Sequence, residues 1–227
     1  MFDIARFIDH SLLIPDAVEK DVLRLCDEAG RYGFHAVCVQ PSYVRTAKEA
    51  LFKTHIKTAT VIGFPLGMTL SQAKTYEAME AVLKGADELD IVINIGFAKS
   101  GSWESVQKEI SDIITATPTA IHKIIIETCY LTDDEKKRVC KAVMNTEAEF
   151  IKTSTGFGPS GAVIRDVEII KSATKGKIGI KASGGINTLA EARAFIKAGA
   201  TRLGTSSGVE IMKELQIQKS KSAKARK

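Results

Sequence analysis

The chain has 227 residues, of which 44% are hydrophobic and 26% are charged, and its formal net charge is +5. This length and this share of apolar residues suit one large domain or two small ones with a full hydrophobic core. The segment after Gln218 contains five basic residues and no acidic one, so the chain up to Gln218 is neutral: Lys219, Lys221, Lys224, Arg226 and Lys227.

These features exclude several classes of protein. No uncharged run reaches the roughly 18 apolar residues that a membrane-spanning helix needs. The first ten residues also lack the apolar core of a signal peptide. We therefore expect a cytoplasmic protein with no membrane contact. Residues 218–227 have the composition of a disordered tail, and one short basic tail gives little reason to expect a nucleic-acid partner.

Four cysteines occur in the chain, and none of them forms a C-x-x-C pair. Cys26, Cys38, Cys129 and Cys140 therefore predict free thiols in a reducing compartment. The spacing of His, Cys and Asp residues indicates no metal site.

From the N-terminus onward, runs typical of strands alternate with helical patterns. The predicted strands cover residues 7–13, 36–39, 56–62, 88–93, 123–127, 150–156, 178–182 and 202–205. The predicted helices cover residues 18–29, 43–52, 70–84, 103–114 and 209–215, and two more begin at the capping boxes Thr132 to Glu135 and Thr188 to Glu191.

This alternation predicts a parallel sheet covered by helices. Eight strands in a chain of this length favour a closed (β/α)8 barrel, the TIM barrel, over an open doubly wound sheet. No G-x-G-x-x-G motif follows the first strand, which argues further against a dinucleotide-binding sheet. We therefore expect a single α/β TIM-barrel domain over residues 1–217, followed by the basic tail.

A lysine lies inside the predicted strand F-I-K-T-S-T-G, where Lys152 is flanked by apolar and β-branched residues. A buried ammonium group costs several kcal/mol unless it is paired or loses its proton. Structural reasons alone seldom place a lysine there. The neutral amine of such a lysine can attack a carbonyl group and form a Schiff base.

Two further charged residues on predicted strands complete this hypothesis. Lys181 lies in I-G-I-K-A-S-G-G-I and Asp90 in E-L-D-I-V-I-N-I-G. If Lys181 lies beside Lys152, repulsion between the two ammonium groups lowers one pKa from about 10.4 towards 7 or 8. Asp90 then transfers protons in a Schiff-base cycle, or merely neutralises Lys181, and both roles can hold together. Alternatively, Lys181 binds a phosphate or carboxylate of a ligand.

Other charged residues on the predicted strands are also expected to point into the barrel near its mouth. These include Asp9 and Glu127, and Glu127 shares a strand face with Lys123 at i and i+4. We interpret Glu127 as an ion-pair partner or as a structural residue.

Two glycine-rich turns follow the seventh and eighth predicted strands: S-G-G-I at residues 183–186 and G-T-S-S-G at residues 204–208. TIM barrels commonly bind phosphate at these two turns through backbone N–H groups and the start of a helix. Because both turns carry the pattern, we expect a phosphorylated ligand.

The motifs together resemble the deoxyribose-phosphate aldolases, a family of class I aldolases with a TIM barrel. The resemblance covers nearly everything before the tail and rests on I-D-H-S-L-L, V-C-V-Q-P, T-V-I-G-F-P-L-G, E-L-D-I-V-I-N-I-G, I-I-E-T, F-I-K-T-S-T-G-F, K-A-S-G-G-I and R-L-G-T-S-S-G-V. It implies reversible cleavage of 2-deoxy-D-ribose 5-phosphate into acetaldehyde and D-glyceraldehyde 3-phosphate, without a metal or an organic cofactor.

The resemblance also implies roles for individual residues. Lys152 would form the Schiff base, and Asp90 and Lys181 would be the proton-transfer pair. The residues implied for binding the substrate or its phosphate are Gly184, Gly185, Gly204, Ser206, Ser207, Gly156, Ser11 and Cys38. The family further implies a homodimer or homotetramer.

Two positions depart from the family pattern: Ser11 stands where the first motif usually has Thr, and Ile14 stands where a Lys often follows. Ser11 keeps the hydroxyl group, whereas Ile14 changes a surface or interface contact. Three alternatives stay open. They are another class I aldolase or transaldolase acting on a different phosphorylated sugar, a barrel that binds a phosphate ligand without catalysis, and nucleic-acid binding through the tail.

Overall fold

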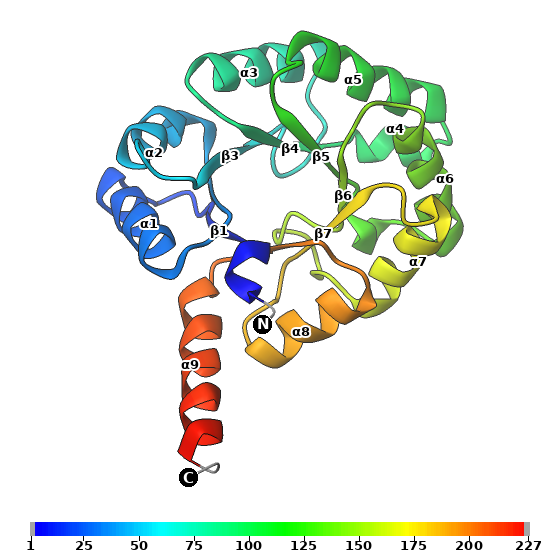
Figure 1. Ribbon diagram of the computed structural model, residues 1–227. Helices are drawn as coiled ribbons and strands as arrows, with labels where there is room; N and C mark the ends of the chain where they lie inside the picture. Colours follow the sequence, from blue (N-terminus) through cyan, green and yellow to red (C-terminus); the bar gives the residue numbers. More distant parts are fainter. Residues whose placement is uncertain (1–2, 225–227) are drawn as a thin grey trace.

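The computed structural model describes residues 3–224 and contains a closed barrel of eight parallel strands (Figure 1). Each strand pairs with the next one in the chain, and the last pairs with the first. The strands are β1 (Ile8–Leu12), β2 (Ala36–Val39), β3 (Lys57–Ile62), β4 (Glu88–Val92), β5 (Ile121–Ile125), β6 (Phe150–Lys152), β7 (Gly179–Ser183) and β8 (Arg202–Thr205). The predicted TIM barrel is confirmed.

Helices surround the barrel and cover the outer face of its strands (Figure 1). They are α1 (Glu19–Tyr32), α2 (Val44–Ala50), α3 (Ser71–Leu83), α4 (Ile95–Lys99), α5 (Trp103–Ala116), α6 (Asp133–Met144), α7 (Ile164–Thr174), α8 (Leu189–Ala198) and α9 (Gly208–Lys224), with short 3-10 helices at Ile4–Phe7, Pro41–Tyr43 and Thr128–Tyr130. The predicted capping boxes at Thr132 and Thr188 open α6 and α8.

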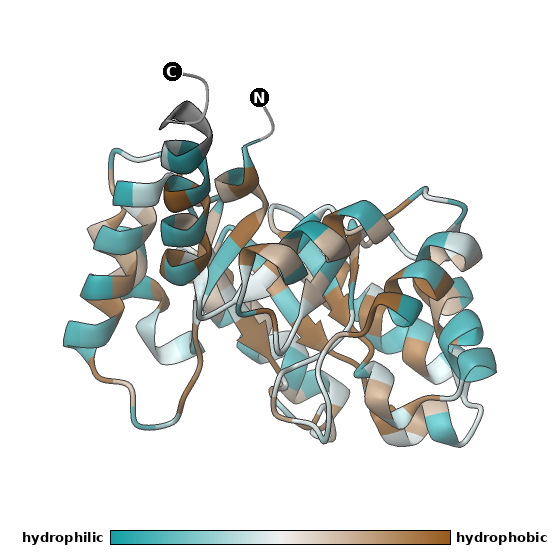
Figure 2. Cartoon of the chain, turned by 90° about the horizontal axis from the view of Figure 1, so that it is seen from below, coloured by the Kyte–Doolittle hydropathy of each residue, from teal (hydrophilic) through white to brown (hydrophobic). Residues whose placement is uncertain are grey.

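The main hydrophobic core lies between the strands and the helices, where apolar strands contrast with the polar outer sides of the helices (Figure 2). Outward-facing strand residues such as Val37, Ile91 and Ile124 are fully buried in this layer. The barrel interior has a second, small apolar cluster, formed by Ala36 and Cys38 of β2 with Ala59 and Val61 of β3. Small side chains therefore fill one side of the interior, and the remaining strands supply polar groups.

Several element boundaries differ from the prediction. β5 begins and ends two residues before the predicted strand, because its pairing with β4 extends from Ile121 to Ile125. β6 ends at Lys152, and a loop follows. In this loop the Thr153 N–H donates to the Lys181 carbonyl of β7. The helices α4 and α7 have no predicted counterpart. α4 has a capping residue, Asn94, but its five residues are too few to show a helical period, and α7 follows Val163, which offers no side-chain cap.

The prediction for the C-terminal segment is corrected in part. α9 continues past the expected end at Leu215 as far as Lys224, so residues 218–224 are helical, although a disordered tail was expected. Lys and Ala favour helices, and no Gly or Pro interrupts this segment. Residues 225–227 lie outside the described residues. Among the helices described, none has both the length and the apolar character that a membrane crossing requires.

Candidate active site

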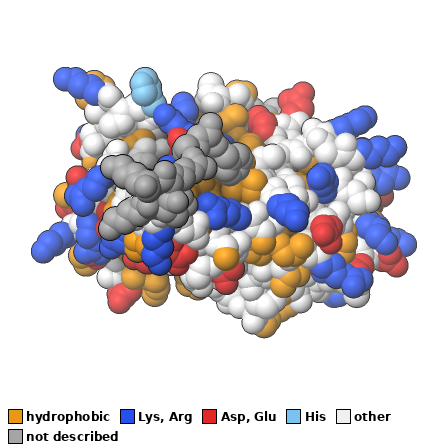
Figure 3. Space-filling view, turned by 60° about the horizontal axis from the view of Figure 1, so that its bottom comes forward, with side chains coloured by type: hydrophobic (Ala, Val, Ile, Leu, Met, Phe, Trp, Pro, Cys, Tyr) orange, Lys and Arg blue, Asp and Glu red, His pale blue; other side chains and the backbone are white. Residues whose placement is uncertain are grey.

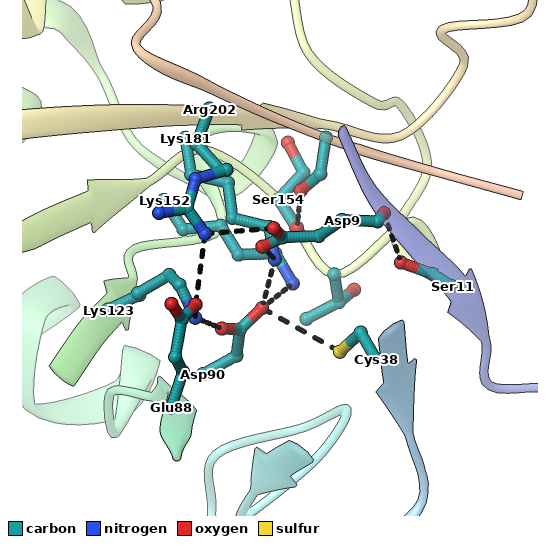
Figure 4. Close-up of polar contacts among 12 residues, drawn as sticks. Asp9, Ser11, Cys38, Glu88, Asp90, Lys123, Lys152, Ser154, Lys181 and Arg202 are labelled. Atoms are coloured by element: carbon teal, nitrogen blue, oxygen red, sulfur yellow. Dashed lines mark hydrogen bonds and ion pairs between the residues drawn. The ribbon is translucent and has the colours of Figure 1, made fainter. Parts of the chain in front are cut away.

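The barrel interior contains a cluster of buried charged side chains (Figure 4). Its members come from β1, β4, β5, β6, β7 and β8: Asp9, Glu88, Asp90, Lys123, Lys152, Lys181 and Arg202. Four of them are cations and three are carboxylates. The interior of a TIM barrel is usually filled with layers of branched apolar side chains, so this cluster is an exception that needs a chemical explanation.

The strand register brings these side chains together. Lys152 is the register partner of Lys181, and Lys181 is the partner of Arg202. On the other side, Asp90 is the partner of Lys123. Register partners on neighbouring strands point to the same face of a sheet, so all of these side chains project into the barrel.

Asp90 lies between three lysines. Its Oδ2 atom accepts hydrogen bonds of 2.8 Å from the Nζ atoms of both Lys152 and Lys181, and its Oδ1 atom accepts one of 2.8 Å from Lys123. Burial raises the pKa of the Asp90 carboxyl, but the three lysines outweigh burial and hold the pKa well below its ordinary value. Asp90 is therefore ionised at neutral pH and can accept a proton.

Lys181 is a second amine that contacts Asp90 Oδ2. Its Nζ atom also donates to Asp9, so it contacts two carboxylates. Burial lowers the pKa of the Lys181 ammonium group, yet Asp9 and Asp90 together raise it above its ordinary value. Lys181 therefore stays charged at neutral pH, as the predicted role of a cation beside Lys152 requires.

Arg202 and Glu88 lie behind these residues. Arg202 donates to Asp9 Oδ1 at 2.9 Å and to Glu88 Oε2 at 3.0 Å. The same Glu88 oxygen lies 2.7 Å from Lys123 Nζ, and Glu88 Oε1 contacts His35 Nε2 at 3.0 Å. Arg202 and Lys123 therefore each contact two carboxylates.

A cavity of about 360 Å³ opens beside Lys152. It is lined by Ser11, Leu13, Ile14, Lys152, Thr155, Gly156, Phe157, Ser183, Gly184, Gly185, Ile186, Asn187, Gly204, Thr205 and Ser206. Lys152 is the one ionisable residue in this lining, whereas Lys123, Lys181 and Arg202 lie outside it. A ligand in the cavity therefore meets the Lys152 amine first.

Most of the predicted binding residues line this cavity, but two do not. The Ser207 hydroxyl donates to Asn187 Oδ1 at 3.0 Å and so links the two glycine-rich turns. Cys38 is fully buried, and its Sγ atom lies 4.0 Å from Asp90 Oδ2. Burial and the neighbouring Asp90 raise the pKa of the Cys38 thiol to about 11, so this thiol is neutral.

Glycine is required in the two turns for different structural reasons. A Cβ atom at Gly204 would lie 2.9 Å from Lys181 Cε, so this residue makes room for Lys181. Gly184 and Gly185 have φ angles of +90° and +77°, which favour glycine, and a Cβ atom at Gly185 would have no neighbour within 4 Å. The backbone of Gly185 thus faces open space at the cavity.

Of the two interpretations given for Glu127, an ion-pair partner or a structural residue, the contacts favour the structural one. It follows β5 with a φ angle of +44°, and its carboxylate accepts hydrogen bonds from the N–H and the hydroxyl of Thr155. The Thr155 hydroxyl oxygen accepts from Phe157 N–H at 3.0 Å. Glu127 therefore shapes the loop that carries Gly156 at the edge of the cavity.

The sequence profile of the DeoC/LacD family aldolases matches residues 4–214. The chain belongs to this aldolase family. The prediction that it is an enzyme of the aldolase class is thereby confirmed.

Individual aldolases are similar to this chain over nearly its whole length. A deoxyribose-phosphate aldolase of Carboxydothermus hydrogenoformans is 50% identical over 216 residues, which are 93% of this chain and 95% of the relative. One from Thermoanaerobacter sp. (strain X514) is 46% identical and covers 93% and 96%. Among solved structures, "QR15, an Aldolase" has a TM-score of 0.92 at 43% identity and covers 96% of this chain and 98% of its own.

A further solved aldolase is described as having a unique tetrameric structure. It is the deoxyribose-phosphate aldolase of Aeropyrum pernix, with a TM-score of 0.88, 34% identity and coverage of 94% of this chain and 91% of its own.

Four members of the charged cluster had no function predicted from the sequence. Glu88 lies two residues before Asp90 on β4, and this spacing was a signal that both point inward. Arg202 opens β8, and Asp9 and Lys123 were noted without their partners. Ile14, expected at a surface or interface, lines the cavity. Within residues 3–224, no group of three or more His, Cys, Asp and Glu side chains is arranged to hold a metal ion.

Proposed function

We propose that this aldolase cleaves 2-deoxy-D-ribose 5-phosphate reversibly into acetaldehyde and D-glyceraldehyde 3-phosphate, through a Schiff base on Lys152. The observation that carries the proposal is the single cavity in which the Lys152 amine and the two glycine-rich turns meet. The names of the relatives, all deoxyribose-phosphate aldolases, support the choice of substrate.

In this reaction the unprotonated Nζ atom of Lys152 adds to the C1 aldehyde carbon of the open-chain sugar. Loss of water gives a protonated Schiff base. A base then removes the proton of the C3 hydroxyl, the C2–C3 bond breaks, and its electron pair moves towards the Schiff-base nitrogen. D-Glyceraldehyde 3-phosphate leaves, the enamine takes a proton at C2, and water releases acetaldehyde.

Asp90 and Lys181 are proposed to move the protons of this cycle. Asp90 is an ionised acceptor within 2.8 Å of Lys152 Nζ, and Lys181 is a charged donor on the same oxygen. Because Asp90 Oδ2 contacts both amines, Asp90 can exchange a proton with Lys152 or with Lys181.

The phosphate of the substrate is proposed to bind at the two turns. Gly184, Gly185 and Ser206 line the cavity, and α9 begins at Gly208, directly after the second turn. Bare backbone at a helix N-terminus favours an anion. Binding there fixes the acceptor half of the sugar while Lys152 holds the other half.

Purified protein should release acetaldehyde from 2-deoxy-D-ribose 5-phosphate, as measured with a coupled alcohol dehydrogenase, and the Lys152→Met variant should not. The alternative functions predict different results. Turnover of a ketose phosphate but not of deoxyribose phosphate would indicate a different class I aldolase or a transaldolase. Phosphate-ligand binding without turnover of either sugar would indicate a non-catalytic barrel.

The face drawn in Figure 3 gives no support for nucleic-acid binding. On the face in Figure 3, Lys and Arg side chains are spread out and mixed with Asp and Glu, outside the atoms drawn in grey. A nucleic-acid site usually requires a continuous basic patch.

We also infer a homodimer or homotetramer in the cytoplasm. α3 exposes Tyr76, Met79 and Leu83 at i, i+3 and i+7, an apolar stripe that a second subunit could cover. All four cysteines are free thiols, which is typical of a reducing compartment. Light scattering measures the assembly state, and a monomeric mass would contradict this inference.

A further inference from the structure

Six members of the charged cluster form a closed ring of alternating charges, which we call the ion ring. Its contacts run from Asp90 to Lys123 (2.8 Å), to Glu88 (2.7 Å), to Arg202 (3.0 Å), to Asp9 (2.9 Å), to Lys181 and back to Asp90 (2.8 Å). Three carboxylates and three cations alternate, so the ion ring has no net charge when all six are ionised.

Lys152 lies outside this ring. It contacts Asp90 Oδ2 at 2.8 Å, but the same oxygen already accepts from Lys181, and Oδ1 accepts from Lys123. Each cation of the ring has contacts with two carboxylates, whereas Lys152 shares one. If Lys152 were protonated, its charge would be the uncompensated one in a buried cluster, and burying an uncompensated charge is costly.

We propose that Glu88, Lys123 and Arg202 are positioning residues that close the ion ring, and that the balanced ring leaves the Lys152 amine as the group that gives up its proton. This inference deepens the proposed function and rests on it, because Schiff-base formation needs the unprotonated amine. It extends the sequence argument, in which Lys181 alone acted on Lys152.

The charges of the ring members support this assignment. Burial raises the pKa of Asp9 and of Glu88, but their cationic neighbours outweigh burial, so both carboxyls have lowered pKa values. Burial lowers the pKa of Lys123 and of Arg202, but Asp90, Asp9 and Glu88 outweigh it and raise both. The ring is therefore fully ionised at neutral pH.

Besides Lys152, two described titratable groups contact the ring from outside. The Cys38 thiol of β2 faces Asp90 and is neutral, since its pKa is about 11. His35 precedes β2 and faces Glu88, with its side chain 31% exposed to solvent. Glu88 itself does not line the cavity, so its substitution changes the charge of the ring without removing a contact to the ligand.

The test is competitive acetylation of Lys152 by acetic anhydride, which acylates only unprotonated amines, with peptide mass mapping across neutral and alkaline pH. Glu88→Gln gives the ring a net positive charge, so the pH of half-maximal labelling should fall by about one unit. Lys123→Met gives it a net negative charge, and this pH should rise by about one unit. The double variant restores the balance and should return close to the wild-type value.

Arg202→Met and Arg202→Lys repeat the comparison on the other side of the ring, and they serve if a variant at Glu88 or Lys123 does not fold. The first should raise the labelling pH of Lys152, and the second, which keeps the charge, should not. The exposed Lys20 is an internal standard in the same digest. Shifts of one sign in both Glu88→Gln and Lys123→Met, or no shift in either, would overturn the proposal, as would a double variant that stays shifted.

Acetylation does not depend on aldehyde chemistry, so the two proposals fail separately. A wild-type protein that labels normally but releases no acetaldehyde from deoxyribose phosphate would refute the proposed function alone.

Discussion

Asp90 combines full burial with contacts to three lysines, and these contacts keep it ionised. The Asp90→Asn variant keeps the shape of the side chain but cannot take up a proton. We expect kcat for cleavage of deoxyribose 5-phosphate to fall by roughly 10²- to 10⁴-fold, which is the range for loss of a general acid–base group. KM should change little, because the phosphate turns are untouched. A loss of kcat below tenfold in steady-state assays would indicate that Asp90 only neutralises its neighbours.

Ser206 tests the phosphate site because it lines the cavity and is exposed. The Ser206→Asp variant places a negative charge near the proposed position of the phosphate. KM for deoxyribose 5-phosphate should rise about tenfold or more, since like charges repel, whereas kcat/KM for unphosphorylated deoxyribose should change much less. Equal losses on the two sugars would mean that this turn has a structural role only.

A buried ion pair outside the charged cluster links helix α3 to helix α5. Lys74 and Glu109 are at most 1% exposed in their side chains, and their charged atoms lie 2.8 Å apart. Lys74 also donates to the Val92 carbonyl, and Glu109 accepts from Asn94 N–H. The pair therefore holds the end of β4, the strand that carries Asp90.

Removing one partner of this pair should be more harmful than removing both. Glu109→Leu leaves the Lys74 ammonium group buried and unpaired, so the free energy of unfolding should fall by about 3 to 5 kcal/mol. The double variant Lys74→Met with Glu109→Leu should lose clearly less, as measured by urea denaturation. If the double variant is as unstable as the single one, the cost arises from lost packing and not from an isolated charge.

The strand boundaries show which parts of the fold could be predicted from the sequence. β8 has the predicted bounds because R-L-G-T follows a glycine-ended helix and precedes a turn, so local signals mark both ends. β5 was placed two residues late because I-H-K-I-I-I-E is apolar on both sides of its true end, and only pairing with β4 decides the boundary. The position of Lys152 on a strand could be predicted from the adjacent residues in the sequence. The contacts of Glu88 and Arg202 were not, because they depend on closure of the barrel.

At the scale of the whole molecule, the buried ions predict the pH range of stability. Asp9, Glu88 and Asp90 have lowered pKa values in the folded state. Their stabilising contribution is therefore full above the unfolded pKa, near 4, and is lost as the pH falls towards their folded values. Lys181 has a raised pKa, so its contribution is full below about pH 10 and is lost at higher pH.

These groups together should give a broad stability plateau between about pH 5 and pH 9, with a lower Tm on both sides. Circular dichroism melting curves across this range provide the measurement. A Tm that rises on acidification below pH 4 would contradict the ionised state of the buried carboxylates.

Reductive trapping identifies the amine that forms the Schiff base, which is proposed to be Lys152. The protein is incubated with acetaldehyde and borohydride, digested and mapped by mass spectrometry. We expect one two-carbon adduct, on Lys152, because this amine lines the cavity while Lys123 and Lys181 do not. An adduct on Lys181, or no adduct in a protein that cleaves deoxyribose 5-phosphate, would contradict the proposed role of Lys152.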